Sequence, residues 1–235
     1  MTSMTSADGP PRRRIASAVG LLFALMIPAA LSAGGAGEFP QDVSVTKGIL
    51  INEATMWGLT FIVLAIVTFW ERRPPTSIGL GPLTWPAVRS GVLYSVLLIF
   101  LAGLTGRLIQ LAGISTQTGN QAELVIAMPI WLQLFAALSA GFTEETLFRG
   151  YAIERMTELT GSRWLGALIP VFVFGAVHAP FWGVGHAVVA GITGLWLTLI
   201  YLRTRNLWTA VVAHALLDGI AFAGTDYLAA IGATS

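Results

Sequence analysis

The sequence predicts an all-α membrane protein, a polytopic bundle of about seven transmembrane helices. Hydrophobic residues make up 55% of the 235 residues and charged residues only 11%, whereas roughly a quarter of a soluble globular domain is charged. The apolar residues also gather in stretches of about twenty, the length that a helix needs to cross a bilayer. The net charge of +1 gives no indication of nucleic-acid binding, and the lack of cysteine excludes disulfides and thiol catalysis.

Seven apolar stretches are the expected transmembrane helices, and turn-rich segments join them. In chain order they cover approximately 15–32, 49–70, 86–112, 124–143 or later, 164–180, 185–202 and 207–223. In the sixth stretch, small residues are spaced by four (Ala187 with Gly191, Ala190 with Gly194), which favours close helix packing.

The arginines fall in alternate connecting segments, and this predicts which side of the membrane each segment occupies. These segments are RRR at 12–14, ERR at 71–73, the segment with Arg155 and Arg163, and RTR at 203–205. The other connecting loops, near 34–48, 113–123 and 181–184, hold a single lysine and no arginine. The positive-inside rule therefore predicts that the amino terminus lies in the cytoplasm. We expect a multi-pass integral protein of the cell (plasma) membrane. The first stretch also has the basic start, apolar core and small residues of a signal peptide, so its cleavage stays open.

A short charged motif, GFTEETLFRG at 141–150, follows the apolar stretch that begins near Leu124. On a helix, Glu145 and Arg149 share one face with the acid first, the favourable order for an ion pair. Glu144 is rotated by about 100° from Glu145 and shares that face poorly. We therefore expect Arg149 to neutralise Glu145 and to leave Glu144 available for chemistry.

Two further sets of polar residues lie within the later stretches. His178 follows Phe174 by four residues and His214 precedes Asp218 by four, so each pair shares a helix face. Ionisable groups inside a membrane cost roughly 2.5–3.5 kcal/mol each on insertion scales and normally face partners in the bundle interior. The three sets are therefore expected to converge.

Convergence requires a long fourth helix. If that helix ended at residue 143, Glu144 would lie at the cytoplasmic surface, and His178 would lie about 21 Å deeper in the membrane. If it continues to about residue 158, both side chains lie near the middle of the membrane. We therefore expect the longer helix.

The three motifs occur together in an order that resembles a known family. EETLFR matches EExxxR, FGAVH matches FxxxH, and HALLD matches Hxxx(D/N), on successive apolar helices. This pattern resembles the CAAX-protease and bacteriocin-processing (CPBP) family, also called the Abi family or type II CAAX prenyl endopeptidases. The resemblance covers about residues 124–223. It divides one integrated membrane domain into N-terminal helices and loops at 1–123, a catalytic core of the CPBP type at 124–224 and a short C-terminal tail at 225–235.

The resemblance implies an intramembrane glutamic endopeptidase. It places at the catalytic site Glu144, His178, His214 and Asp218, with Glu145, Arg149 and Phe174 in support. The first two catalytic residues would activate a water for attack on a peptide carbonyl, and the last two would stabilise the oxyanion. The implied substrates are membrane-associated or lipidated (CAAX-like) proteins or leader peptides, met in the lipid bilayer and without nucleic acid. The sequence demands no metal or other cofactor.

Several alternatives stay open at this point. Glu144, His178 and His214 could form a zinc site with an open water position, although the sequence has no HExxH motif. A non-catalytic immunity factor or scaffold of the same fold would share these helices. Asp218 stands where the family has Asp or Asn; it either carries a proton and donates to the oxyanion, or stays ionised and orients His214. The sequence does not specify the natural substrate, its prenylation or the oligomeric state.

Overall fold

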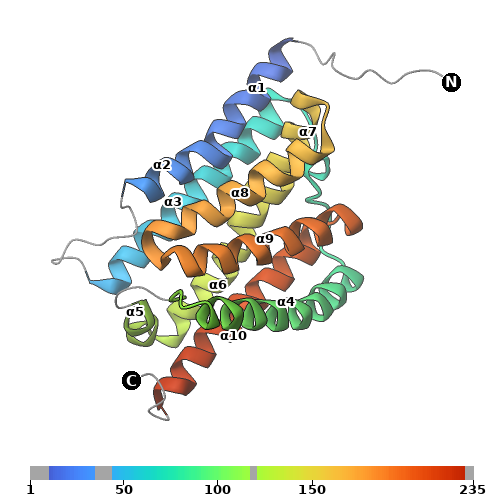
Figure 1. Ribbon diagram of the computed structural model, residues 1–235. Coiled ribbons are helices and arrows are strands. Elements are labelled where there is room, and N and C mark those ends of the chain that lie inside the picture. Colours follow the sequence, from blue (N-terminus) through green and yellow to red (C-terminus); the bar gives the residue numbers. More distant parts are fainter. Residues whose placement is uncertain (1–10, 35–43, 117–120, 231–235) are drawn as a thin grey trace.

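The computed structural model describes residues 11–34, 44–116 and 121–230, and it confirms the all-α fold class (Figure 1). Every regular element within these ranges is a helix. The last helix continues to Ala230, so the first part of the predicted tail is helical. The rest of that tail, 231–235, lies outside the described residues.

Six helices in the described ranges are long and apolar enough to cross a membrane. These candidate spans are Pro11–Ala33, Val45–Trp70, Trp85–Leu111, Arg163–Trp182, Val184–Thr204 and Leu207–Thr225. In the labels of Figure 1, the first consists of α1 (Pro11–Leu21), the π-helical turn η1 (Leu22–Met26) and α2 (Ile27–Ala33), and the second of α3 (Val45–Ala65) and η2 (Ile66–Trp70). The others are α4 (Trp85–Leu111), α8 (Arg163–Trp182), α9 (Val184–Thr204) and α10 (Leu207–Ala230). Together with the motif-bearing segment described next, they are compatible with the prediction of about seven.

The motif-bearing helix begins later than the sequence suggested. The expected start near Leu124 instead falls in a separate short helix, α5 (Gln121–Ala127), and α6 (Ile130–Glu144) begins only after Pro129. Pro129 is extended, with a ψ of 147°. The physical reason is the proline itself, because the residue that precedes a proline is pushed out of the helical conformation.

From Ile130 onward the helical segment is long. Without a break, α6 continues into the π-helical η4 (Glu145–Ile153) and then into α7 (Glu154–Thr160). It stops at Gly161, which adopts the left-handed conformation with a φ of 70°. The predicted continuation of the fourth helix to about residue 158 is therefore confirmed.

The motif-bearing segment lies at the centre of the bundle. α6 packs against α3 and α10, and η4 packs against α8, α9 and α10. α8 and α9 lie side by side along their lengths (Figure 1), and a Cβ added to Gly175 of α8 would lie only 3.1 Å from the Cα of Gly191 of α9. The close packing predicted from the small residues of the sixth stretch is confirmed.

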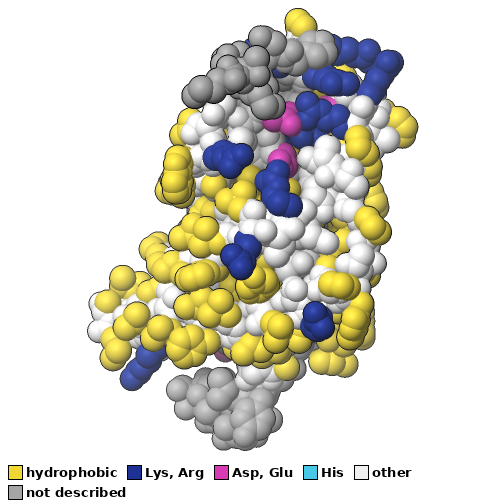
Figure 2. All heavy atoms as spheres, turned by 90° about the vertical axis from the view of Figure 1, so that its right-hand side faces the viewer, with side chains coloured by type: hydrophobic (Ala, Val, Ile, Leu, Met, Phe, Trp, Pro, Cys, Tyr) yellow, Lys and Arg dark blue, Asp and Glu magenta, His cyan; other side chains and the backbone are white. Residues whose placement is uncertain are grey.

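Apolar side chains cover the outside of the bundle. Figure 2 shows hydrophobic side chains over much of one face; the acidic side chains in view lie towards its upper end together with many of the basic ones, and single basic side chains lie further down. On α4, Leu93, Val96 and Phe100 are among the most exposed large hydrophobic residues. Such a surface fits contact with lipid tails and does not fit contact with water.

One end of the bundle contains a network of buried polar groups. Arg155 of α7 forms an ion pair of 2.8 Å with Glu71, and both side chains are fully buried. The other carboxylate oxygen of Glu71 accepts hydrogen bonds from Ser17 of α1 and Tyr151 of η4, each of 2.9 Å. α1 is therefore a packed part of the bundle, and its removal would take one donor away from a buried carboxylate.

The same end brings several arginine-bearing segments together. Arg73 lies 2.6 Å from Glu158 of α7, and Arg205 lies 2.9 Å from Glu154 of α7. The segments at 71–73, 154–158 and 203–205 therefore meet at one end of the bundle, as the alternation of arginines along the chain requires.

Candidate active site

The glutamate doublet lies where α6 passes into the π-helical η4. π-helical turns are rare and frequently occur at functional sites. Glu145 and Arg149 are both buried, and Nη1 of Arg149 lies 2.8 Å from Oε1 of Glu145. Arg149 also donates to the carbonyl of Gly194 at 3.3 Å, and its Cζ lies 4.0 Å from the centre of the Phe174 ring. The ion pair predicted from the four-residue spacing is confirmed.

The imidazole of His214 is held by the same carboxylate. Nδ1 of His214 lies 2.8 Å from Oε1 of Glu145, the oxygen that Arg149 also contacts. An ionised carboxylate only accepts hydrogen bonds, so Nδ1 carries the hydrogen and donates it. Sequence reasoning had paired Glu145 with Arg149 alone and missed this contact. The bond fixes the tilt of the ring and leaves Nε2 to face the remaining acidic groups.

Glu144 and Asp218 lie on the Nε2 side of that imidazole. Oε2 of Glu144 is 3.9 Å and Oδ2 of Asp218 is 3.5 Å from Nε2 of His214. The side chain of Glu144 is 20% exposed and that of Asp218 is 28% exposed, whereas that of Glu145 is 0% exposed. In the described part of the chain no arginine or lysine forms an ion pair with Glu144. The two neighbouring glutamates are thus in different environments.

His178 of α8 is positioned by its own helix. Its Nδ1 lies 2.7 Å from the carbonyl oxygen of Phe174. Because a carbonyl can only accept, Nδ1 carries the hydrogen, and Nε2 of the neutral ring carries a lone pair. The ring centre of His178 also lies 4.8 Å from that of Phe174, so the FxxxH spacing provides both contacts. Within the described residues no hydrogen bond joins His178 to Glu144, and the water that they were expected to share stays a prediction.

Phe174 connects the two histidines with the arginine. Its ring centre lies 6.1 Å from that of His214 on one side, and Arg149 lies over its face. This packing depends on Gly194 of α9, where an added Cβ would lie 2.7 Å from Cδ1 of Phe174 and 2.9 Å from Nη2 of Arg149. Glycine is required at this position because any side chain would displace both neighbours.

Two of the three residues considered for a zinc site have other partners. Nδ1 of His214 contacts Glu145, and Nδ1 of His178 contacts a backbone carbonyl. Among the residues that the structure describes, no group of three or more His, Cys, Asp or Glu side chains is arranged to hold a metal ion. This geometry leaves the cofactor prediction untested.

Sequence reasoning missed two groups beside the site. Glu53 of α3 is buried and accepts a hydrogen bond from Ser139 of α6, which precedes Glu144 by five residues. The rule that ionisable groups inside a span mark functional sites would have found Glu53, since it falls within the second apolar stretch. His186 of α9 has its ring centre 6.0 Å from that of His178, and no motif indicated that contact.

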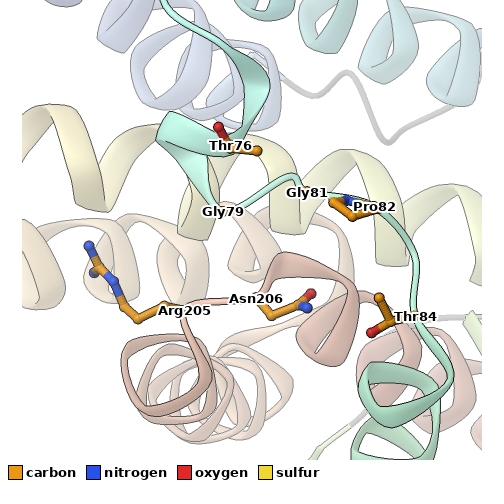
Figure 3. Close-up of a pocket in the computed structure, with 7 residues that line it drawn as sticks. All are labelled: Thr76, Gly79, Gly81, Pro82, Thr84, Arg205 and Asn206. Atoms are coloured by element: carbon orange, nitrogen blue, oxygen red, sulfur yellow. The ribbon is translucent and has the colours of Figure 1, made fainter.

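A separate hollow of about 200 Å³ lies among the connecting loops (Figure 3). It is lined by Thr76, Gly79, Gly81, Pro82, Thr84, Arg205 and Asn206. Arg205, on its edge, is engaged with Glu154. None of the predicted catalytic residues lines this hollow, so it is distinct from the candidate active site.

The candidate site lies within the part of the chain that matches a known family. Residues 126–220 match the family model described as type II CAAX prenyl endopeptidase Rce1-like. The family resemblance predicted from the three motifs is therefore confirmed over this segment, and at the level of the family it implies a membrane-embedded peptidase. No curated protein and no solved structure matches the chain.

Proposed function

Because residues 126–220 match the Rce1-like type II CAAX prenyl endopeptidases, we propose that this chain is an intramembrane endopeptidase. It hydrolyses a peptide bond of a membrane-associated or lipidated protein. Hydrolysis adds the hydroxide part of water to the carbonyl carbon and a proton to the departing amine. The site must therefore supply a base for the water, donors for the oxyanion and a proton for the amine.

The observation that carries the proposal is that the neighbouring residues Glu144 and Glu145 differ in burial and in bonding partners. Glu145 is buried and bonded to both Arg149 and His214. Glu144 is partly exposed and has no basic partner at hydrogen-bond distance among the described residues. A carboxylate without an arginine partner accepts a proton more readily than one paired with arginine, which is a poor base. Glu144 is the general base in this proposal.

His178 assists Glu144 at the water. Its Nδ1–H is committed to the carbonyl of Phe174, and the lone pair on Nε2 is free to accept a hydrogen bond from the attacking water. Glu144 takes one proton from that water as the oxygen bonds to the carbonyl carbon. When the tetrahedral intermediate collapses, Glu144 returns this proton to the amine nitrogen, and the C–N bond breaks.

His214 stabilises the oxyanion by donating a hydrogen bond to it. With Nδ1–H donated to Glu145, a proton on Nε2 provides a donor directed at the space beside Glu144 and Asp218. Glu145 and Arg149 hold the imidazole in one orientation, much as a buried carboxylate holds the histidine of a catalytic triad. Asp218 supplies a second donor in its protonated form.

The arginine-bearing end of the bundle faces the cytoplasm in this proposal, and the protein lies in the cell membrane. The ion pairs that gather segments 71–73, 154–158 and 203–205 at one end support this orientation, because cytoplasmic loops carry an excess of arginine and lysine. A lipidated carboxyl-terminal peptide reaches the site from that side with its lipid in the bilayer. Bacteriocin-type leader peptides are the alternative substrate class.

The test uses protein reconstituted in liposomes and a fluorogenic peptide that ends in a farnesylated CAAX sequence, with an unprenylated peptide beside it. The wild-type protein is expected to cleave the first. Glu144→Gln should lose activity by about a hundredfold or more, while the matched change Glu123→Gln, at an exposed position of α5, should keep it. Cleavage that persists in Glu144→Gln would contradict the proposal and favour a different base or a scaffold role. Adding a metal chelator to the wild-type reaction separates the zinc-dependent alternative.

A further inference from the structure

Glu53 differs from the other buried glutamates of the bundle. Glu71 is paired with Arg155, and Glu145 is paired with Arg149. Glu53 is 7% exposed, yet no arginine, lysine or histidine of the described chain forms an ion pair with it. A buried carboxyl group without a cationic partner reduces stability, and inside a membrane span such a group usually serves a function.

A chain of hydrogen bonds fixes Glu53 against the motif-bearing helix. Nε1 of Trp57, one turn further along α3, donates to Oγ of Ser139 at 2.7 Å. Oγ of Ser139 in turn donates to Oε2 of Glu53. The indole can only donate and an ionised carboxylate can only accept, so Ser139 accepts from Trp57 and gives its one hydroxyl hydrogen to Glu53. The Glu53 carboxyl group is thereby held beside α6, just before Glu144.

The contact with Ser139 brings a third acidic group towards the site. Ser139 precedes Glu144 by five residues on the same helix, and this helix, α6, packs against both α3, which carries Glu53, and α10, which carries Asp218. These three carboxyl groups come from α3, α6 and α10, and Glu145 does not belong to the set, because Arg149 and His214 already engage it. A negative charge beside a carboxylate base increases the affinity of that base for the proton that it takes from water.

We infer that Glu53 is a positioning residue of the active centre, which acts on Glu144 through the charge of its carboxyl group. The catalytic part of this inference rests on the proposed endopeptidase function. It extends the site beyond residues 126–220, the segment that matches the family, to a helix of the N-terminal part of the chain. Glu53 does not touch the reacting atoms; it sets how readily Glu144 accepts and releases its proton.

The first measurement compares Glu53→Gln with Glu71→Gln in the liposome assay. For Glu53→Gln we expect kcat to fall about tenfold, KM to stay within about twofold, and the melting temperature to stay equal or rise, because an unpaired buried charge is removed. Glu71→Gln should show the opposite pattern, a lower melting temperature with unchanged kcat per folded molecule, because it removes the buried anionic partner of Arg155 and leaves only the partly exposed Glu158 to pair with it. A Glu53→Gln protein that melts earlier and keeps its kcat would make Glu53 a purely structural residue.

Two further variants separate the charge of Glu53 from its hydrogen bond. Ser139→Ala removes the bond but keeps the carboxyl group, and Glu53→Asp keeps the charge on a shorter side chain. Both should retain most of the kcat that Glu53→Gln loses. If Ser139→Ala lowers kcat as much as Glu53→Gln does, then Glu53 acts only as a contact between helices, and the inference is wrong.

A measurement independent of proteolysis tests the coupling itself. Dicyclohexylcarbodiimide reacts with protonated carboxyl groups in membranes, and mass spectrometry reports the rate at which Glu144 is modified. Glu53→Gln should slow this labelling by about threefold or more, because Glu144 loses a neighbouring negative charge. An unchanged rate overturns the inference. If the labelling slows while wild-type protein cleaves neither peptide, the proposed endopeptidase function fails and the coupling of Glu53 to Glu144 stands.

Discussion

Glu145 of η4 and His214 of α10 are joined by a hydrogen bond of 2.8 Å between Oε1 and Nδ1, although 69 residues separate them along the chain. The same Oε1 accepts from Arg149 at 2.8 Å. Oε2 of Glu145 is buried and has no hydrogen-bond partner in the described part of the chain. One oxygen thus fixes both a guanidinium and an imidazole, so substitutions at these three positions are expected to be strongly non-additive.

Arg149→Ala is expected to destabilise the protein more than Glu144→Ala. It leaves the buried Glu145 without its cation, and breaking one side of a buried pair costs on the order of 3–5 kcal/mol. Glu144 is partly exposed and has no such pair to break. Thermal unfolding in detergent measures the difference, and equal melting temperatures would contradict it.

His178→Ala is expected to abolish proteolysis without loss of helix content or membrane insertion. The ring makes a local hydrogen bond to Phe174 and lies half-buried, so its removal disturbs little packing. His186→Ala is the matched control, since that ring contacts His178 and has no hydrogen bond or ion pair with an acidic group among the residues that the structure describes, and it should lose less than about tenfold in rate. Cleavage that survives His178→Ala would remove this residue from the mechanism.

Asp218→Asn is expected to keep most of the activity. Asparagine places a permanent donor where a protonated Asp218 would donate, whereas loss of an oxyanion donor typically costs about 10²–10³ in rate. The orienting bond to His214 comes from Glu145 and stays intact in this variant. Cleavage assays from mildly acidic to mildly alkaline pH decide the question, and a loss of about a hundredfold at every pH would show that Asp218 works as an ionised group.

Gly194→Ala is expected to reduce both stability and activity. The new methyl group would lie 2.7 Å from the ring of Phe174 and 2.9 Å from Arg149, and overpacking of this kind costs about 1–3 kcal/mol. Gly58→Ala on α3 is the matched control, because nothing lies within 4 Å of its added Cβ, and it should be neutral. Equal behaviour of the two variants would show that α9 can move away at no cost.

Arg155→Gln is expected to lower the melting temperature far more than Arg73→Gln. Arg155 and its partner Glu71 are both fully buried, whereas Glu158, the partner of Arg73, is 42% exposed. A broken buried pair costs about 3–5 kcal/mol and an exposed pair contributes about 1 kcal/mol or less. Added salt should reduce only the contribution of the Arg73 pair.

The Arg73 pair is not expected to respond to pH near neutrality. Partial burial lowers the pKa of Arg73, but the hydrogen bond and charge of Glu158 outweigh this effect and raise the pKa overall. A group whose pKa is raised on folding adds stability below its unfolded pKa, and this stability is lost only as the pH rises through the folded value. For an arginine this window is strongly alkaline, so unfolding curves of Arg73→Gln and wild type should differ by a constant amount around neutral pH.

The parts of the site that follow from local geometry could be predicted from the sequence. The pairing of Glu145 with Arg149 follows from their spacing on one helix, and counting residues by depth indicated that the motif-bearing helix continues past Glu144. The late start of α6 could also be expected from the sequence, because Pro129 disfavours a helical conformation at the residue before it.

The contacts between different helices could not be predicted from spacing along the sequence. Whether Glu145 or Glu144 meets His214 depends on the rotation of α10 against η4, and the π-helical turn changes the angle between successive side chains. Glu53 belongs to a helix without a recognised motif, and only its depth and its contact with Ser139 connect it to the site.

The buried pair of Glu71 and Arg155 also has a consequence for biogenesis. The two residues are 84 positions apart, so a ribosome delivers the acid to the insertion machinery long before the base that pairs with it. Of the three side chains that bind Glu71, only Ser17 precedes it, 54 residues earlier in the chain, because Tyr151 and Arg155 both follow. Contact between the first two candidate spans is therefore what offers this acid a hydrogen-bond donor until η4 and α7 have been synthesised.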